Sequence, residues 1–389
     1  MFNKDYNEWV ELGAGHTARE ITQQPKTWIK TYDIINNLKE ELKNFINDVI
    51  KHHNHRIIFT GAGTSEFVGN TIKPVLSRNK NLNVDSVGTT DLVVSPELYF
   101  NENIPTLLVS FGRSGNSPES IAAVDLADQI SDNVKHLSIT CNHEGKLATK
   151  EAKNFFVIKL PEETNDQSLA MTSSYSNMYL AALLAFNLDK LDNLKEDLEI
   201  VSKAGMKFNK EDYATLETLL AEFNLERLIY LGDAQHTGVA QESALKALEL
   251  SGGKVSVMHN TPLGFRHGPK SFINQKTLIT VFLQNDPYIR KYQKDLINEI
   301  KAQQDGYQIL AVDFQKDPEI EALVDKYMVI QYNKDIENGL EVLNLVMIGQ
   351  TIAFYKSLME DLSPDNPSPT GVINRIVQGV VIYPYNKEA

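Results

Sequence analysis

The chain contains only one cysteine, Cys141, among 389 residues. A single thiol cannot form an intramolecular disulfide, and it leaves no cysteine cluster for zinc or for an iron–sulfur centre. This composition fits a reducing compartment, and we expect a cytoplasmic protein. The first residues also lack the basic segment and the apolar run of a secretory signal, so we expect no export by that route.

The sequence is also poor in positive charge and in long apolar runs. Its 38 Lys and Arg residues and 51 Asp and Glu residues give a formal net charge of -13 at pH 7. A nucleic-acid-binding protein needs a basic face that displaces phosphate counterions, so we expect no nucleic-acid partner. Apolar runs such as 178–186 are shorter than the roughly 20 residues that cross a bilayer, so we expect no membrane partner.

What is present is the composition of an ordinary globular protein, with 42% hydrophobic and 23% charged residues. Short β-branched and aromatic runs alternate with helical patterns, which predicts an α/β fold with parallel strands and crossover helices. A predicted strand at 56–60 runs into Gly61, and a similar strand at 227–231 runs into Gly232, 171 residues later. We therefore predict a duplicated unit.

Composition also indicates where the parts of the chain begin and end. We expect an N-terminal helical segment at 1–45, a first domain at 46–205, a second domain at 215–362 and a C-terminal tail at 363–389. The polar stretch at 190–210 is the predicted linker between the two halves. Three prolines between residues 363 and 369 end the last predicted helix.

Hydroxyl side chains follow two of the predicted strands. Thr64 and Ser65 come after the first strand, and Ser114 and Ser117 come after the strand at 106–110. Backbone N–H groups at helix N-termini, together with such hydroxyls, form a neutral cradle for a phosphate monoester. We predict a phosphate site here; the alternative is that the hydroxyls only cap helices.

The turn Gly61-Ala62-Gly63 also resembles the start of a dinucleotide-binding fold, with Asp85 roughly 20 residues further on. Glu66 stands where the third glycine of that motif would be. It would prevent close helix packing and would place a carboxylate beside the pyrophosphate. We therefore favour phosphate over dinucleotide binding.

The strongest chemical signal is the segment 239–253, a predicted helix that two glycines close. Its only charged residues are Glu242, Lys246 and Glu249, which share one stripe of a helix. One interpretation is a solvated Glu–Lys pair on the protein surface. The other is a cleft in which a carboxylate shuttles a proton while an ammonium stabilises a developing oxyanion. Because a Glu four residues before a Lys is the favoured helical pairing, we assign Glu242 to orienting Lys246.

His267 and the group of histidines at 52–55 invite a functional interpretation. His267 lies between glycines and a proline in a predicted loop, and its imidazole is suited to opening and closing a sugar ring. The alternative is an ordinary surface residue. The histidines at 52–55 precede the first strand, away from the strand ends where α/β sites assemble, so we interpret them as a polar loop and not as a metal site.

Together these motifs resemble the pair of sugar isomerase (SIS) domains in the isomerase half of glucosamine-6-phosphate synthase. The segments in question are Gly63-Thr64-Ser65, Arg113-Ser114-Gly115-Asn116-Ser117, Gln241-Glu242-Ser243-Ala244-Leu245-Lys246 with Glu249, Arg266-His267-Gly268-Pro269, and Arg19-Glu20-Ile21 with Gln24-Pro25. Residues 110–117 and 374–379 are most similar to the tagatose-6-phosphate ketose/aldose isomerase family, also described as galactosamine-6-phosphate deaminase/isomerase. The resemblance covers nearly the whole chain. It implies two tandem SIS domains, each a flavodoxin-like α/β/α sandwich.

The resemblance also implies roles for individual residues. The substrate phosphate would be bound by Ser65, Ser114 and Ser117, with Thr64, Arg113, Thr172 and Ser173. Glu249 would be the base that moves a proton between C1 and C2, and Lys246 would lie beside the enediolate or enolamine. His267 would be the ring-opening acid/base, in its own subunit or across a dimer interface.

The chain departs from the synthase in two ways. This sequence does not include a glutaminase half with its N-terminal cysteine nucleophile, so we do not expect ammonia to be drawn from glutamine by that route. The tail lysine of the synthase has Arg375 as its nearest counterpart, and an arginine cannot form a Schiff base at accessible pH. Lysine-assisted ring opening is therefore not expected.

These observations predict an enzyme that converts an amino-sugar 6-phosphate, galactosamine 6-phosphate, to tagatose 6-phosphate and ammonia. The alternatives are a plain aldose–ketose isomerase of hexose 6-phosphates and a non-catalytic sugar-phosphate-binding SIS protein. A transcriptional regulator of that last kind needs a DNA-reading helix, and the first 50 residues offer no basic one. We expect no cofactor, no metal, and a homodimer or higher homo-oligomer.

Overall fold

The computed structural model describes residues 2–336, 338–368, 370–375, 377 and 379–386. Contacts among them divide the chain into two compact units. Unit 1 has the limits Met1–Lys26, Gln167–Thr172 and Glu196–Val372, and unit 2 has the limits Thr27–Asp166, Ser173–Lys195 and Ile373–Ala389. Each unit is therefore assembled from segments that are separate in the sequence. The continuous domain boundaries expected from composition stay a prediction.

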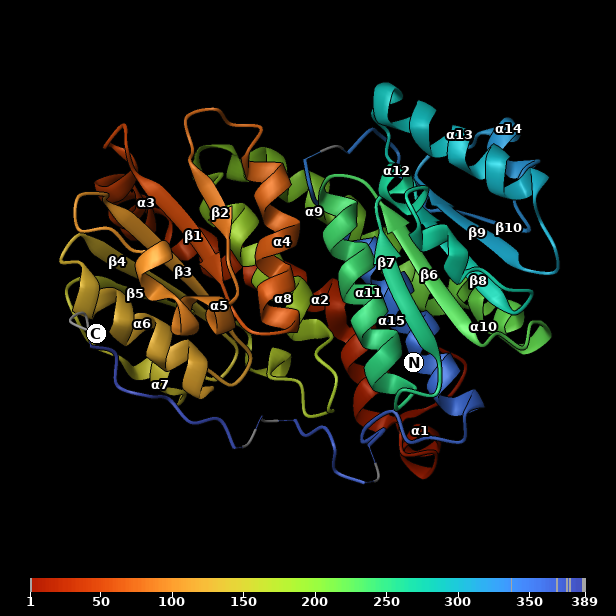
Figure 1. Ribbon diagram of the computed structural model, residues 1–389, viewed down its shortest axis with the longest axis horizontal. Coiled ribbons are helices and arrows are strands. Elements are labelled where there is room, and N and C mark those ends of the chain that lie inside the picture. Colours follow the sequence, from red (N-terminus) through yellow and green to blue (C-terminus); the bar gives the residue numbers. More distant parts are fainter. Residues whose placement is uncertain (1, 337, 369, 376, 378, 387–389) are drawn as a thin grey trace. The chain divides into compact units, whose positions relative to one another are not determined.

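Unit 2 is built on a parallel sheet with the strand order β2-β1-β3-β4-β5 (Figure 1). Its strands are β1 (Arg56–Thr60), β2 (Val84–Ser86), β3 (Thr106–Gly112), β4 (Val134–Thr140) and β5 (Phe155–Lys159). Its helices include α3 (Lys39–Ile50), α4 (Thr64–Leu76), α5 (Thr89–Val94), α6 (Pro118–Ile130), α7 (Lys146–Thr149) and α8 (Ser173–Ala185). Strand β2 follows β1 in the sequence and lies on one side of it, and the chain then crosses over so that β3 lies on the other side of β1. The strand order therefore reverses between β1 and β3, which is where open α/β sheets bind ligands.

Unit 1 repeats this arrangement with the order β10-β9-β8-β6-β7. Its strands are β6 (Arg227–Gly232), β7 (Ser256–Asn260), β8 (Thr277–Phe282), β9 (Gln308–Asp313) and β10 (Lys326–Val329). Its helices include α1 (Tyr6–Glu11), α10 (Tyr213–Glu222), α11 (Gln235–Leu250), α12 (Pro262–Phe265), α13 (Pro287–Ala302), α14 (Pro318–Glu321) and α15 (Val342–Met359). Read from β7 outward, the order is that of unit 2. The predicted α/β fold with a duplicated unit is confirmed.

Two edge strands and one helix differ from the sequence-based expectation. Strand β2 has only three residues and strand β7 mixes polar and apolar ones, so no apolar run marked them in advance. The stretch expected as a linker forms helix α9 (Leu191–Lys207), and the division between the units falls inside this helix. Leu194, Leu198 and Val201 are buried along it, so a sparse helical stripe of apolar residues was hidden by the polar composition.

The core of each unit lies between its sheet and the helices packed on it. In unit 2, side chains of β1 and β3 such as Ile58 and Leu108 pack against α6. In unit 1, strand residues such as Ile279 and Ile309 pack against α13. Helix α15 is apolar enough in length and composition to cross a membrane, but 89% of it is buried inside the protein, where it packs against α10 and α11.

Candidate functional site

The first candidate loop of unit 2 connects β1 to α4. A Cβ on Gly61 would lie 2.5 Å from the backbone carbon of Ser65, so only glycine permits this close approach of helix and strand. Gly63 has φ +56°, a left-handed conformation that glycine adopts without strain. The turn places the buried side chains of Thr64 and Ser65 in the first turn of α4.

The second candidate loop connects β3 to α6, and Thr60 of β1 pairs with Ser110 of β3 in register, so both loops leave the same edge of the sheet. The hydroxyl of Ser114 accepts from the backbone N–H of Asn116 at 3.2 Å, and the hydroxyl of Ser117 donates to Ser120 at 2.6 Å. The structure therefore brings the predicted phosphate-binding serines to neighbouring strand ends at the switch point.

Arg113 and Arg375 lie in one network of unit 2. The guanidinium of Arg113 donates to the backbone carbonyl of Arg375 at 2.6 Å. Arg375 in turn donates from Nε to the carbonyl of Asp166 at 2.8 Å and from Nη2 to the side chain of Asn165 at 3.1 Å. The two arginines thus link the loop after β3, the C-terminal tail and the segment that contains Asn165 and Asp166. Residues 376 and 378 of the tail motif lie outside the described residues.

Sequence reasoning missed Asp166, which is completely buried. Its carboxylate accepts the hydroxyl of Ser173, and it also accepts the backbone N–H of Ser174 at 2.9 Å and the hydroxyl of Ser174 at 2.6 Å. Asp166 therefore caps the start of α8 from seven residues away, a spacing that no local capping pattern reveals. Ser173 faces this carboxylate.

The segment before α8 is held within unit 1 by the N-terminal part of the chain. The buried carboxylate of Glu20 accepts from the backbone N–H of Gln167 at 2.6 Å and from the Ser168 hydroxyl. The carbonyl of buried Thr172 accepts from Gln350 at 3.2 Å, and Gln24 donates to Gln350 at 2.7 Å. The leading motif singled out in the sequence thus supports the residues that precede α8.

The charged stripe lies on α11 of unit 1, which packs against β6, β7 and α15. Lys246 and Glu242 have exposed side-chain fractions of 0% and 1%, whereas that of Glu249 is 23%. Lys246 Nζ lies 2.5 Å from Glu249 Oε2 and 3.5 Å from Glu242 Oε1. A solvated surface pair is therefore excluded, and Glu249 is the member of the stripe that reaches solvent.

His267 follows α12 on an exposed loop of unit 1. Arg266 binds Asp295 at 2.9 Å and Glu299 at 2.8 Å, and Lys270 also binds Glu299. The hydrogen bond from Lys270 holds the pKa of Glu299 below its usual value, with help from Arg266. Two cations that flank His267 in sequence are thus clamped to α13, so the exposed imidazole is carried on an anchored loop.

Three further features remain: Asp85, a possible metal site and a pocket in unit 1. Asp85 forms ion pairs with Arg56 at 2.8 Å and Lys73 at 3.4 Å. The described part of the chain contains no group of three or more His, Cys, Asp or Glu residues that could hold a metal ion.

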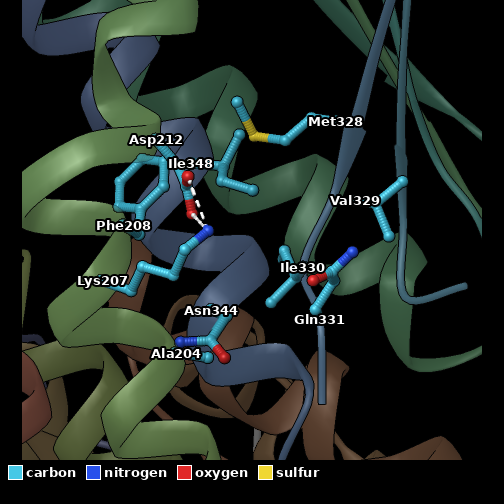
Figure 2. Close-up of a pocket in the computed structure, with 10 residues that line it drawn as sticks. All are labelled: Ala204, Lys207, Phe208, Asp212, Met328, Val329, Ile330, Gln331, Asn344 and Ile348. Atoms are coloured by element: carbon cyan, nitrogen blue, oxygen red, sulfur yellow. Dashed lines mark hydrogen bonds and ion pairs between the residues drawn. The ribbon is translucent and has the colours of Figure 1, made fainter.

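A small apolar pocket in unit 1 lies between α9, the end of β10 and α15 (Figure 2). Lys207 and Asp212 pair at its edge at 2.9 Å, and none of the predicted site residues lines it.

Comparisons with known proteins identify similar sequences and structures over nearly the whole chain. The model of the SIS domain matches residues 50–188. The D-galactosamine-6-phosphate deaminase AgaS of Shewanella sp. strain ANA-3 is 39% identical over 97% of this chain and 94% of its own. A solved structure from Clostridium novyi NT has a TM-score of 0.96 and 42% identity, covering 99% of each chain. The tagatose-6-phosphate ketose/aldose isomerase of Escherichia coli has a TM-score of 0.84 and 35% identity, covering 95% of this chain and 96% of its own.

Proposed function

Because the chain belongs to the SIS-domain family of D-galactosamine-6-phosphate deaminase AgaS and tagatose-6-phosphate ketose/aldose isomerase, we propose that it converts galactosamine 6-phosphate to tagatose 6-phosphate and ammonia. The observation that carries the proposal is an identity of 39% to a deaminase over 97% of the chain. The test is ammonia release across a panel of hexosamine and hexose 6-phosphates. Galactosamine 6-phosphate should be the best substrate, and ketose formation without ammonia would favour plain isomerisation.

Plain aldose–ketose interconversion is the second candidate, because the similar Escherichia coli structure is named as an isomerase. Both reactions need the same proton transfer between C1 and C2. They differ in whether C2 bears nitrogen or oxygen.

In the proposed mechanism His267 opens the sugar ring and Glu249 takes the C2 proton, which gives an enolamine. A proton returned to C1 converts the enolamine to a C2 imine. Water then adds to this imine and ammonia leaves, so the ketose remains. Lys246 stabilises the oxyanion that develops at O1, and the buried Glu242 orients Lys246.

The substrate phosphate is assigned to the loops of unit 2, with Ser65, Ser114 and Ser117 as hydroxyl donors. Backbone N–H groups at the start of α4 add partial positive charge. Thr64, Arg113, Thr172 and Ser173 form the surroundings of this site in the proposal. Ser173 donates to Asp166 and Arg113 donates to the C-terminal tail, so the proposed role of these two residues is to fix the conformation of the loops.

Replacing Ser114 with Ala is expected to raise the Kd for the phosphosugar about tenfold, because a hydrogen bond to an anion is lost. Isothermal titration with substrate measures this change. Ser131→Ala, at the opposite end of α6, is the matched control and should leave the Kd unchanged. Unphosphorylated galactosamine should be a poor substrate, since it loses this binding energy. Equal turnover of the free sugar would contradict the phosphate assignment.

Activity is expected to survive treatment with EDTA. A proton shuttle through an enolamine needs a base and a fixed positive charge, and Lys246 supplies that charge. The measurement is the rate of ammonia release before and after chelation and dialysis. Complete loss of this rate, restored by one divalent metal, would show that the mechanism is wrong.

We further propose a cytoplasmic homodimer or higher homo-oligomer, with domains at 46–205 and 215–362. An exposed imidazole on an anchored loop is suited to a residue that completes the site of a neighbouring subunit. Sedimentation of the purified chain tests the assembly.

A further inference from the structure

The duplicated fold gives unit 1 a second turn with the geometry of the phosphate loop. Gly63 before α4 has φ 56° and ψ -125°, and Ala234 before α11 has φ 50° and ψ -124°. A Cβ on Gly232 would lie 2.6 Å from the backbone carbon of His236, the same close approach as that of Gly61 to Ser65. Ala234 adopts this positive φ without the glycine that favours it, so the tight turn is held by the surrounding structure.

At equivalent places in the two repeats, the side chains of the second repeat are larger. Gln235 stands where unit 2 has Thr64, and His236 stands where it has Ser65. Glu341 immediately precedes α15, the place that Thr172 takes before α8. Three small hydroxyl residues are therefore replaced by three large polar ones.

These three large side chains interact with one another. Gln235 Nε2 donates to Glu341 Oε1 at 2.8 Å, and His236 Nε2 lies 3.6 Å from the same oxygen. The backbone N–H of Gly339 donates to Glu341 Oε2 at 2.9 Å. Exposed fractions are 1% for Gln235 and His236 and 3% for Glu341. The carboxylate thus accepts from one side chain and one backbone N–H group in the interior of unit 1.

Burial by itself would raise the pKa of Glu341, but the contacts with His236 and Gln235 outweigh burial and hold it below its usual value. Hydrogen bonds to both carboxylate oxygens, from Gln235 and from the backbone of Gly339, likewise favour the charged form of Glu341. A carboxylate and a phosphate accept hydrogen bonds from the same kinds of donor.

We propose that the Glu341 carboxylate occupies the second cradle in place of a phosphate, so that the chain binds phosphate at one sheet only. The inference deepens the proposed function, because it rests on the assignment of phosphate to the corresponding loops of unit 2. Gln235 and His236 hold the carboxylate there, because Gln235 donates to Glu341 and the imidazole of His236 lies beside the same oxygen. Replacing these three residues with Thr, Ser and Thr, as at positions 64, 65 and 172, opens a second site.

The test is the number of inorganic phosphate ions bound per chain, measured by equilibrium dialysis on the full-length protein. Wild type should bind one, and the triple variant Gln235→Thr/His236→Ser/Glu341→Thr should bind two. The variant Glu341→Gln keeps the volume of the side chain, so it should still bind one. In the Ser114→Ala background the triple substitution should still add one site, which places the added site outside unit 2.

Two sites in wild type, or no added site in a triple variant with a native near-UV circular dichroism spectrum, would overturn the proposal. If the triple variant does not fold, Glu341→Thr alone is measured against Glu321→Thr, which removes an equal charge from an exposed position. A gain of one site in the first and none in the second supports the proposal, and equal stoichiometry overturns it. If wild type binds no phosphate, the assignment in unit 2 fails, while the added site still tests Glu341.

Discussion

The variant Glu249→Gln is expected to lose about 10²-fold or more in turnover while it retains affinity for the substrate. The amide has the volume of the carboxylate and can still accept from Lys246, which lies 2.5 Å away. It cannot take up the C2 proton. Because the loss falls on a proton transfer, kcat should fall while the Kd changes little.

The decisive measurement for Glu249 is deuterium incorporation from solvent at the transferred position, alongside binding by calorimetry. Wild type should exchange this hydrogen and Glu249→Gln should not. Glu222→Gln, at the exposed end of α10, is the control for a Glu-to-Gln change elsewhere in unit 1. Exchange and turnover at wild-type rates in Glu249→Gln would leave the stripe without a catalytic role.

The variant Lys246→Met is expected to lose both turnover and stability. A fixed ammonium at a developing oxyanion contributes about 10²–10³-fold to the rate. The same ammonium neutralises Glu242, which is nearly fully buried on α11. Removing one partner of a buried ion pair costs about 3–5 kcal/mol, so the free energy of unfolding should fall by that amount.

The two effects of Lys246 can be separated with a double variant. Lys246→Met/Glu242→Met removes both fully buried charges and should recover most of the lost unfolding free energy, because the remaining carboxylate, Glu249, reaches solvent. Turnover should stay low, because the ammonium is still missing. Chemical denaturation and ammonia release measure the two quantities. Recovery of activity together with stability would mean that Lys246 only supports the fold.

Local sequence determined much of the candidate site. The serine loops after β1 and β3 could be placed at one sheet edge because parallel strands end on the same side. The stripe on α11 followed from helical spacing, which depends only on 3.6 residues per turn. The duplicated turn was visible as two glycines 171 residues apart, Gly61 and Gly232.

Partners and burial were decided by tertiary structure, because they depend on residues that are distant in sequence. The i,i+4 rule predicts Glu242 as the partner of Lys246, yet Glu249 lies closer, since packing against β6, β7 and α15 buries the lysine. Asp166 was invisible as the cap of α8.

Arg375 and Glu341 show the same limit. Arg375 could be aligned with a lysine, but its hydrogen bonds to Asp166 and Asn165 arise only where the tail returns to unit 2. Glu341 has no local motif, and it reaches Gln235 across 106 residues of chain. Composition, periodicity and turn chemistry act over a few residues, and they specified most elements of this protein, though not β2, β7 or α9. Which buried charges meet is set by how these elements pack, which only the folded chain determines.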